Sequence, residues 1–273
     1  MQASRAQVGG ATALRALRAR QWCHLALLPA AGTELFTHRS LGFLALARGF
    51  LVAGLTLAFS YGINAMHDRS TDRSPAKNPL AGAPSVTTET CALVWGCGAL
   101  ALVAAGAGGL RPVACVSVSL LAGAVYSAGP RLKSYPFVGT VLNVGIFLPL
   151  MWVAGRPIHA VLPVAFVTLL LQNQLWHERE DLDEDRGAAV RTTAAVLGEG
   201  GTRVAATLVG ALGGLAAAVV ARGDRLEAAA AVVACAFGTL APLFAPAEHR
   251  RVVHRVGAIM GGAIVYGAGL AAP

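Results

Sequence analysis

The sequence predicts an all-α membrane protein, a bundle of nine transmembrane helices. Hydrophobic residues make up 55% of the 273 residues and charged residues only 13%, which is too little polar surface to coat a soluble globule of this size. The apolar residues also fall into long runs and not into the short alternating stretches of a β-barrel. Helices satisfy every backbone group within lipid, so the spanning segments are predicted to be helical.

Nine apolar runs are long enough to cross about 30 Å of hydrocarbon as helices. We expect them at 22–37, 41–63, 90–109, 112–129, 138–155, 158–177, 203–221, 227–245 and 252–271. The first run contains Pro29 and Gly32, which favours a kinked or partly interfacial segment. Residues 1–21 are expected to form a cytoplasmic N-terminal segment, followed by a single membrane domain over 22–273.

The Lys and Arg residues predict the orientation. If the N-terminus is cytoplasmic, 16 of them fall in cytoplasmic loops and five on the opposite side. By the positive-inside rule the N-terminus is predicted to be cytoplasmic and the C-terminus outside, in a multi-pass protein of a bacterial-type inner membrane. The net charge of +8 is explained by this topology, so no nucleic-acid partner is expected.

Acidic residues are concentrated in two short stretches. Of the 14 Asp and Glu residues, eight lie there. These eight are Asp68, Asp72, Glu178, Glu180, Asp181, Asp183, Glu184 and Asp185. Loops that needed only to be solvated would have scattered acids, so the concentration predicts a bound cation.

The two stretches share one spacing. Residues 64–72 have the pattern N-x-x-x-D-x-x-x-D, and residues 177–185 have the pattern H-x-x-x-D-x-x-x-D. Residues four apart lie on one face of a helix, so each motif is predicted to present two carboxylates together. Such oxygen ligands suit Mg²⁺, which completes its coordination with water and phosphate oxygens. Two motifs facing one another would hold a diphosphate through magnesium ions.

Cations near the acidic motifs agree with a phosphate ligand. Arg131 and Lys133 follow the fourth predicted helix on the same side of the membrane, and Arg191 follows the second motif. Arginine offers phosphate a two-pronged hydrogen-bonding fork, and lysine offers a point charge. The alternative is that these residues only mark the topology.

The ordered set of motifs resembles the UbiA superfamily of intramembrane prenyltransferases. The set comprises N-x-x-x-D-x-x-x-D after the second predicted helix, Y-S-x-x-P-R-L-K at 126–133, and D-x-x-x-D followed by R-T at 181–192. The resemblance implies nine helices around a central cavity, capped by cytoplasmic loops. It also implies an Mg²⁺-dependent enzyme that binds a prenyl diphosphate and transfers the prenyl group to a small hydrophobic or aromatic acceptor within the bilayer.

The resemblance assigns roles by position. The implied catalytic residues are Asp68, Asp72, Asp181 and Asp185. The implied metal ligands are these four with Asn64 and Glu178, and the implied diphosphate-binding residues are Asn64, Tyr126, Arg131, Lys133 and Arg191.

Three positions depart from the common family pattern. Ala65 stands where an Asp often follows the first Asn, residues 77–79 read Lys-Asn-Pro where Arg-Pro is frequent, and His177 stands where Asn or Asp is frequent. These departures leave the diphosphate-binding motifs intact and bear on the identity of the acceptor.

Three other functions are alternatives. One is a terpene cyclase, in which the substrate's own double bonds attack the cation. Another is phosphoribosyl transfer to a lipid phosphate, because residues 17–22 are similar to the start of such enzymes. A third is a divalent-cation transporter, although transport acids are expected near the bilayer midplane and not at the membrane face.

Overall fold

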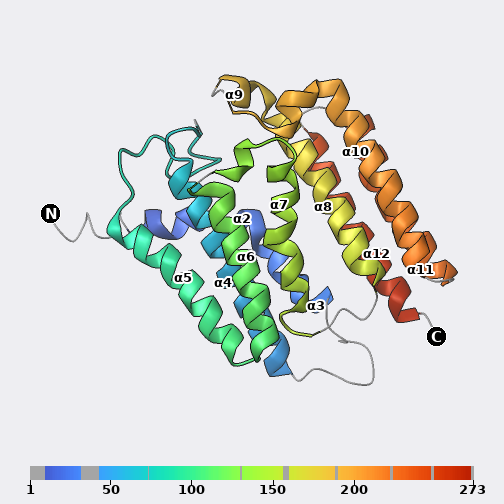
Figure 1. Ribbon diagram of the computed structural model, residues 1–273, viewed down its shortest axis with the longest axis horizontal. Helices are drawn as coiled ribbons and strands as arrows, with labels where there is room; N and C mark the ends of the chain where they lie inside the picture. The colour runs from blue at the N-terminus through green and yellow to red at the C-terminus, as the bar shows by residue number, and fades with distance from the viewer. Residues whose placement is uncertain are drawn as a thin grey trace. The chain divides into compact units, whose positions relative to one another are not determined.

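The protein is all-helical in a computed structural model that describes residues 10–31, 43–72, 74–129, 131–155, 160–187, 190–221, 224–246 and 249–271 (Figure 1). Within these ranges there is no β-strand, so the predicted all-α class is confirmed. Residues 10–16 are helical. The later elements are α2 (Ala19–Trp22), η1 (Cys23–Leu27), α3 (Leu28–Ala31), α4 (Phe43–His67), α5 (Thr88–Gly106), α6 (Leu110–Ser127), η2 (Leu132–Ser134), α7 (Val138–Phe147), η3 (Leu148–Trp152), α8 (Val161–Glu180), α9 (Leu182–Gly187), α10 (Thr193–Val220), α11 (Arg225–Phe244) and α12 (Arg250–Ala271), where η marks a 3-10 helix.

The chain divides into two compact units. Unit 1 comprises Met1–Leu35, Ser40–Leu132 and Gly145–Arg156, and unit 2 comprises Phe36–Arg39, Lys133–Val144 and Pro157–Pro273. The chain passes from unit 2 back to unit 1 within α7. The first motif lies in unit 1 and the second motif in unit 2. A single domain over 22–273 remains a prediction.

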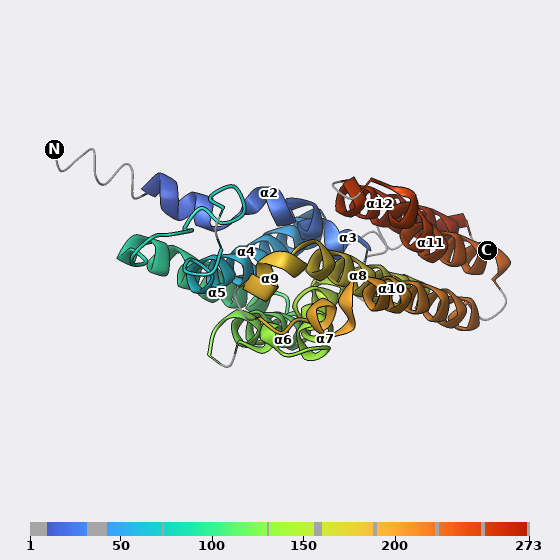
Figure 2. The same cartoon turned by 90° about the horizontal axis from the view of Figure 1, so that it is seen from above.

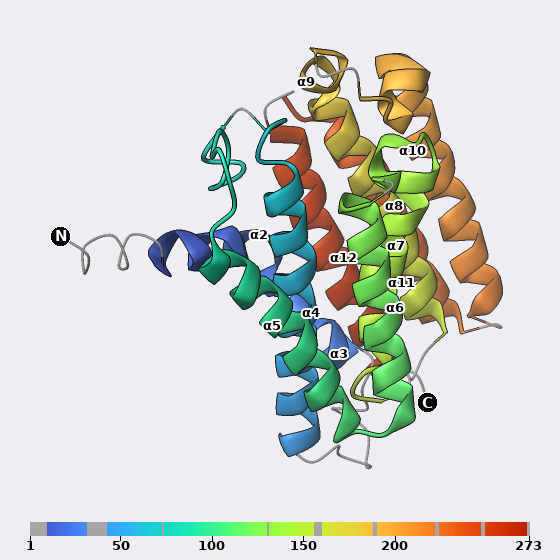
Figure 3. The same cartoon turned by 60° about the vertical axis from the view of Figure 1, so that its left-hand side comes forward.

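Unit 1 is built on α4, which packs against α5 and α6 (Figure 3). Small residues allow these helices to approach closely. A methyl group added at Gly123 of α6 would lie 2.5 Å from Ser60 Oγ of α4, so the glycine is required by the contact. The first predicted run is divided into α2, η1 and α3, in agreement with the kink expected near Pro29.

Unit 2 is built on α8, which contacts α10, α11 and α12, while α11 packs along α12 (Figure 2). Leu175, Trp176 and Ala206 form a buried apolar cluster between α8 and α10. Gln172 of α8 is fully buried and donates to Thr239 Oγ1 of α11 at 2.7 Å. The side-chain nitrogen of this buried glutamine thus forms a hydrogen bond between helices.

The helices match the predicted runs in place but not always in length or polarity. Five of them are long and apolar enough to cross a membrane: α4, α5, α6, α10 and α11. The apolar stretches Val138–Trp152 and Val252–Ala268 are shorter. Helix α8 spans 20 residues but includes Gln172, Asn173 and Gln174. The sequence therefore predicted the positions of the helices better than their individual character.

Two differences concern helix ends. Helix α10 begins at Thr193, ten residues before the predicted start, and Gly198 inside it has a φ of 68°, which kinks the helix. The second acidic stretch is divided: Glu178 and Glu180 lie in α8, and Asp183, Glu184 and Asp185 lie in a separate short helix, α9. The predicted residues 32–37, 41–42 and 158–159 lie outside the described part of the chain.

Candidate active site

The first motif continues the hydrogen bonding of α4 beyond its last residue. The Asp68 amide donates to the Asn64 carbonyl at 2.9 Å, and the Asp72 amide donates to the Asp68 carbonyl at 2.8 Å. These bonds join residues four apart, as in an α-helix. Asn64, Asp68 and Asp72 are therefore held as successive turns, as the spacing predicted.

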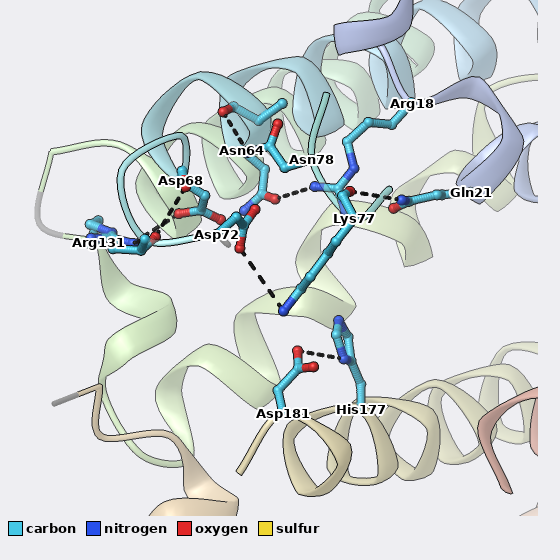
Figure 4. Close-up of polar contacts among 12 residues, drawn as sticks. Arg18, Gln21, Asn64, Asp68, Asp72, Lys77, Asn78, Arg131, His177 and Asp181 are labelled. Atoms are coloured by element: carbon cyan, nitrogen blue, oxygen red, sulfur yellow. Dashed lines mark hydrogen bonds and ion pairs between the residues drawn. The ribbon is translucent and has the colours of Figure 1, made fainter. Parts of the chain in front are cut away.

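Asp68 is the most buried acid of the first motif, with 4% of its surface exposed. Arg131 donates from Nη2 to Asp68 Oδ1 at 2.9 Å (Figure 4). Asn64 donates from Nδ2 to Ser127 Oγ at 3.1 Å. The segment at 126–133 therefore binds the end of α4 at two points, and it supplies the cation that compensates the buried carboxylate.

A second arginine reaches the first motif from the N-terminal segment. Arg18 donates from Nη1 to Asn64 Oδ1 at 2.9 Å (Figure 4). Its guanidinium carbon lies 5.8 Å from the centre of the Tyr61 ring. Nearby, Gln21 donates to the Lys77 carbonyl at 3.3 Å. From the sequence, Arg18 was only one of the 16 Lys and Arg residues that predict the orientation. It also lies in the stretch 17–22 that is similar to phosphoribosyl-transferring enzymes.

Both arginines have an unusual backbone. The φ angle is 54° at Arg18 and 48° at Arg131, in the left-handed region that non-glycine residues rarely adopt. This conformation costs about 1–2 kcal/mol per residue. Such backbone strain persists where the surrounding structure holds a residue in one position, and functional sites are common examples. Here both strained residues place their side chains beside the first motif.

The positions in unit 1 that depart from the common family pattern form contacts within the loop that follows the first motif. Asn78 is fully buried, and its side-chain amide donates to the Ala65 carbonyl at 3.0 Å while its oxygen accepts from the Leu80 amide at 2.9 Å. Lys77 Nζ lies 4.0 Å from Asp72 Oδ1 (Figure 4). The Lys-Asn pair thus fixes the loop after the motif to α4 and places a cation beside the second aspartate.

The second motif differs from the continuous helix that the spacing predicted. Helix α8 ends at Glu180, and Asp181 at its C-cap has φ −86° and ψ 2°, after which α9 begins. The four-residue connection nevertheless survives, because the Asp185 amide donates to the Asp181 carbonyl at 2.8 Å. His177, the third departure, places Nδ1 3.1 Å from Asp181 Oδ2 (Figure 4).

Besides Glu178, four predicted residues remain: Asp185, Arg191, Tyr126 and Lys133. Asp185 accepts from Thr192 Oγ1 at 3.0 Å, and the same hydroxyl caps α10 by accepting from the Ala195 amide. Arg191 is exposed and has no hydrogen bond or ion pair within the part of the chain that the structure describes. Tyr126 in the last turn of α6 and Lys133 in η2 are half-buried.

Glu178 has a different environment from the aspartates. It is 6% exposed, and its carboxylate accepts from Thr140 Oγ1 at 2.9 Å, from Gln174 Nε2 at 3.1 Å and from the Ala194 amide at 3.2 Å. Thr140 lies on α7 and Ala194 in the first turn of α10. Glu178 therefore joins α7, α8 and α10 immediately below the second motif.

Both motifs offer the oxygen donors that a divalent cation requires. Within the described residues, however, no three His, Cys, Asp or Glu side chains gather closely enough to hold a metal ion. Instead Asp68 is bound by Arg131 and Asp181 by His177. A metal ion at either motif would compete with these contacts, because both the ion and the basic side chains bind the carboxylate oxygens.

The fold and these two motifs define an all-α integral membrane protein with acid-rich helix ends. The chain belongs to the UbiA prenyltransferase family, whose sequence model matches residues 24–255. This confirms the resemblance on which the expected roles depend. No curated protein is significantly similar in sequence.

Solved structures share the fold. A UbiA homolog from Archaeoglobus fulgidus bound to GPP and Mg²⁺ matches 94% of this chain and 99% of its own, with 20% identity and a TM-score of 0.77. The same homolog bound to DMAPP and Mg²⁺ matches 93% of this chain and 99% of its own, with 20% identity and a TM-score of 0.73. Digeranylgeranylglyceryl phosphate synthase matches 95% of this chain and 96% of its own, with 16% identity and a TM-score of 0.68.

Proposed function

We propose that this protein transfers the prenyl group of a prenyl diphosphate to a small aromatic acceptor within the membrane, and that it requires Mg²⁺. The observation that carries the proposal is the contact between buried Asp68 and Arg131. It brings a carboxylate of the kind that binds Mg²⁺ next to a guanidinium of the kind that binds phosphate. A diphosphate complexed with magnesium needs both groups.

The family and the ligands of the Archaeoglobus fulgidus homolog, GPP and DMAPP with Mg²⁺, support the donor and the metal. In this chain the ligands for Mg²⁺ would be carboxylates of the two motifs with the Asn64 amide oxygen. When bound, the ion would neutralise the diphosphate and favour its departure. The proposed ligands in unit 1 are Asn64, Asp68 and Asp72, and those in unit 2 are Asp181 and Asp185.

The chain's own cations have defined tasks in this proposal. If Asp68 held a metal ion, the Arg131 guanidinium that now contacts Asp68 would be available to the diphosphate oxygens. Arg18 is held over Tyr61 and fixes the orientation of Asn64. Lys133, Arg191 and the Tyr126 hydroxyl are the further proposed diphosphate contacts. The positive charges of Lys133 and Arg191 and a hydrogen bond from the Tyr126 hydroxyl would stabilise the negative charge that develops on the leaving group.

The proposed reaction also requires apolar surroundings for its cationic intermediate. After the carbon–oxygen bond breaks, an allylic cation survives only where bulk water is excluded, and an electron-rich carbon of the acceptor then attacks it. The proton lost from the acceptor leaves to solvent or to a nearby base. We also propose that both motifs face the cytoplasm, in keeping with the bias of Lys and Arg in the loops.

The proposal is tested by incubating the purified protein in detergent with labelled prenyl diphosphates and Mg²⁺, with and without a phenolic or quinolone acceptor. We expect diphosphate release and a prenylated product that both require the acceptor. A cyclic hydrocarbon formed without acceptor would replace the transferase with a cyclase. Absence of diphosphate release from every prenyl donor would refute both enzymes.

A further inference from the structure

Unit 2 contains a polar cleft of about 630 Å³ that the proposed reaction does not use. Its lining residues come from the end of α8, from α9 and from the first turns of α10 and α12. Its charged lining residues are Arg179, Glu180, Asp183, Arg186, Glu199 and Arg250. Asp181 and Asp185 of the second motif are not among the described residues that line it. The cleft is therefore distinct from the acidic motif of the same unit.

Arg179 is held rigidly in the wall of this cleft. Its side chain is only 7% exposed, and its guanidinium carbon lies 5.6 Å from the centre of the Trp176 ring. It donates to Glu199 Oε1, and Arg203 donates to the same oxygen at 2.7 Å. One carboxylate thus serves two guanidinium groups, and the buried Nε of Arg179 has no partner in the described structure.

Arg250 supplies the least compensated charge. Its Nε donates to the Ala245 carbonyl at 3.1 Å, and its two terminal nitrogens have no partner among the described residues. Burial lowers the pKa of Arg250, and the nearby Arg179 and Arg203 lower it further, against a smaller opposing effect of Glu199 and Glu180. Among the neighbouring charges, the two arginines thus affect this pKa more than the two glutamates do.

We propose that the cleft binds a phosphate group, carried either by a membrane lipid headgroup or by a free phosphate or diphosphate. Guanidinium groups match the geometry of phosphate oxygens and bind them with paired, charge-assisted hydrogen bonds. Basic pockets at the ends of transmembrane helices are suited to lipid headgroups. Arg250 would contact the phosphate directly. Arg186, whose Nη1 lies 3.7 Å from Asp183 Oδ1, would turn from this carboxylate to the phosphate, and Arg179 would complete the site from the wall.

Trp176 provides a built-in reporter because its ring lies against Arg179. The full-length protein is titrated with inorganic phosphate or diphosphate in detergent, without Mg²⁺ and without a prenyl donor, while tryptophan fluorescence is recorded. A parallel series uses nanodiscs of phosphatidylcholine with and without phosphatidic acid. Trp176→Phe identifies the part of the signal that comes from this residue. Without metal or donor, the result does not depend on the proposed prenyl transfer.

We expect a saturable change that Arg250→Gln weakens about tenfold, which corresponds to about 1.4 kcal/mol. Arg225→Gln is the matched control, since it removes the same charge at the start of α11 outside the cleft. Arg186→Gln is the second variant, to be used if Arg250→Gln fails to fold. The Arg186 side chain is 58% exposed and so tolerates replacement, and its loss should also weaken binding. A response to free anions assigns the site to a soluble phosphate, and a response confined to phosphatidic acid assigns it to a lipid. No response to either probe, or equal weakening by Arg225→Gln and the cleft variants, would overturn the proposal.

Discussion

Replacing Glu178 with alanine tests whether this residue holds the helices together or binds metal. The substitution removes a carboxylate that accepts three hydrogen bonds from α7, α8 and α10. Thr140 retains its hydrogen bond to Thr193 at 2.6 Å, whereas Gln174 Nε2 and the Ala194 amide each lose this buried acceptor. Removing one partner of a buried hydrogen bond costs about 1–3 kcal/mol, so we expect a loss of about 3 kcal/mol for the two.

The assay is thermal unfolding of the detergent-solubilised protein, followed by tryptophan fluorescence. In a domain of 150–250 residues each kcal/mol shifts the Tm by about 2–4 °C, so Glu178→Ala should lower it by about 6–12 °C. Asp183→Ala is the control, because the Asp183 side chain is fully exposed at 100% and should leave the Tm within about 2 °C. An unchanged Tm for Glu178→Ala together with lost Mg²⁺ affinity would refute the structural role and make Glu178 a metal ligand.

Three further outcomes are expected. Asp181→Asn should reduce diphosphate release at least about 100-fold, as removal of an electrostatic catalytic group usually does. Replacement of the exposed neighbour, Asp183→Asn, should change the rate by no more than about threefold. Equal losses in turnover assays would mean that Asp181 is not a ligand of the magnesium diphosphate. Arg131→Ala should raise the KM for the prenyl diphosphate in turnover assays. A fall in Tm without any change in KM would make the role of Arg131 purely structural. Asn78→Ala should lower the Tm by about 3–8 °C, because the Ala65 carbonyl and Leu80 amide lose their partner, and a Tm equal to that of wild type in the same melting assay would contradict this bond network.

The sequence predicted the site best where spacing alone determines geometry. Asn64, Asp68 and Asp72 are four residues apart, and backbone hydrogen bonds between residues four apart hold them in register. The loop at 126–133 could be associated with this motif only through the family resemblance. Its contact with Asp68 joins residues 63 positions apart, which no local pattern encodes.

Other features could not be predicted because they depend on partners distant in the chain. Arg18 bonds to Asn64 across 46 residues, and Glu178 bonds to Thr140 across 38. The family resemblance implied that Glu178 is a metal ligand, which stays a prediction. In the structure its carboxylate accepts hydrogen bonds from Thr140, Gln174 and the Ala194 amide. The helix break at Asp181 was missed because the continuous spacing of charged residues resembles that of one long helix.

The central claim is that carboxylates of the two motifs bind a prenyl diphosphate through Mg²⁺. Isothermal titration of the purified protein with geranyl diphosphate, with and without Mg²⁺, tests it most directly. Mg²⁺ should strengthen the binding of geranyl diphosphate to the wild-type protein. In the presence of Mg²⁺, both Asp68→Ala and Asp181→Ala should weaken binding at least about 100-fold, which corresponds to about 2.7 kcal/mol. Equal affinity with and without Mg²⁺, or binding that survives both substitutions unchanged, would contradict the account.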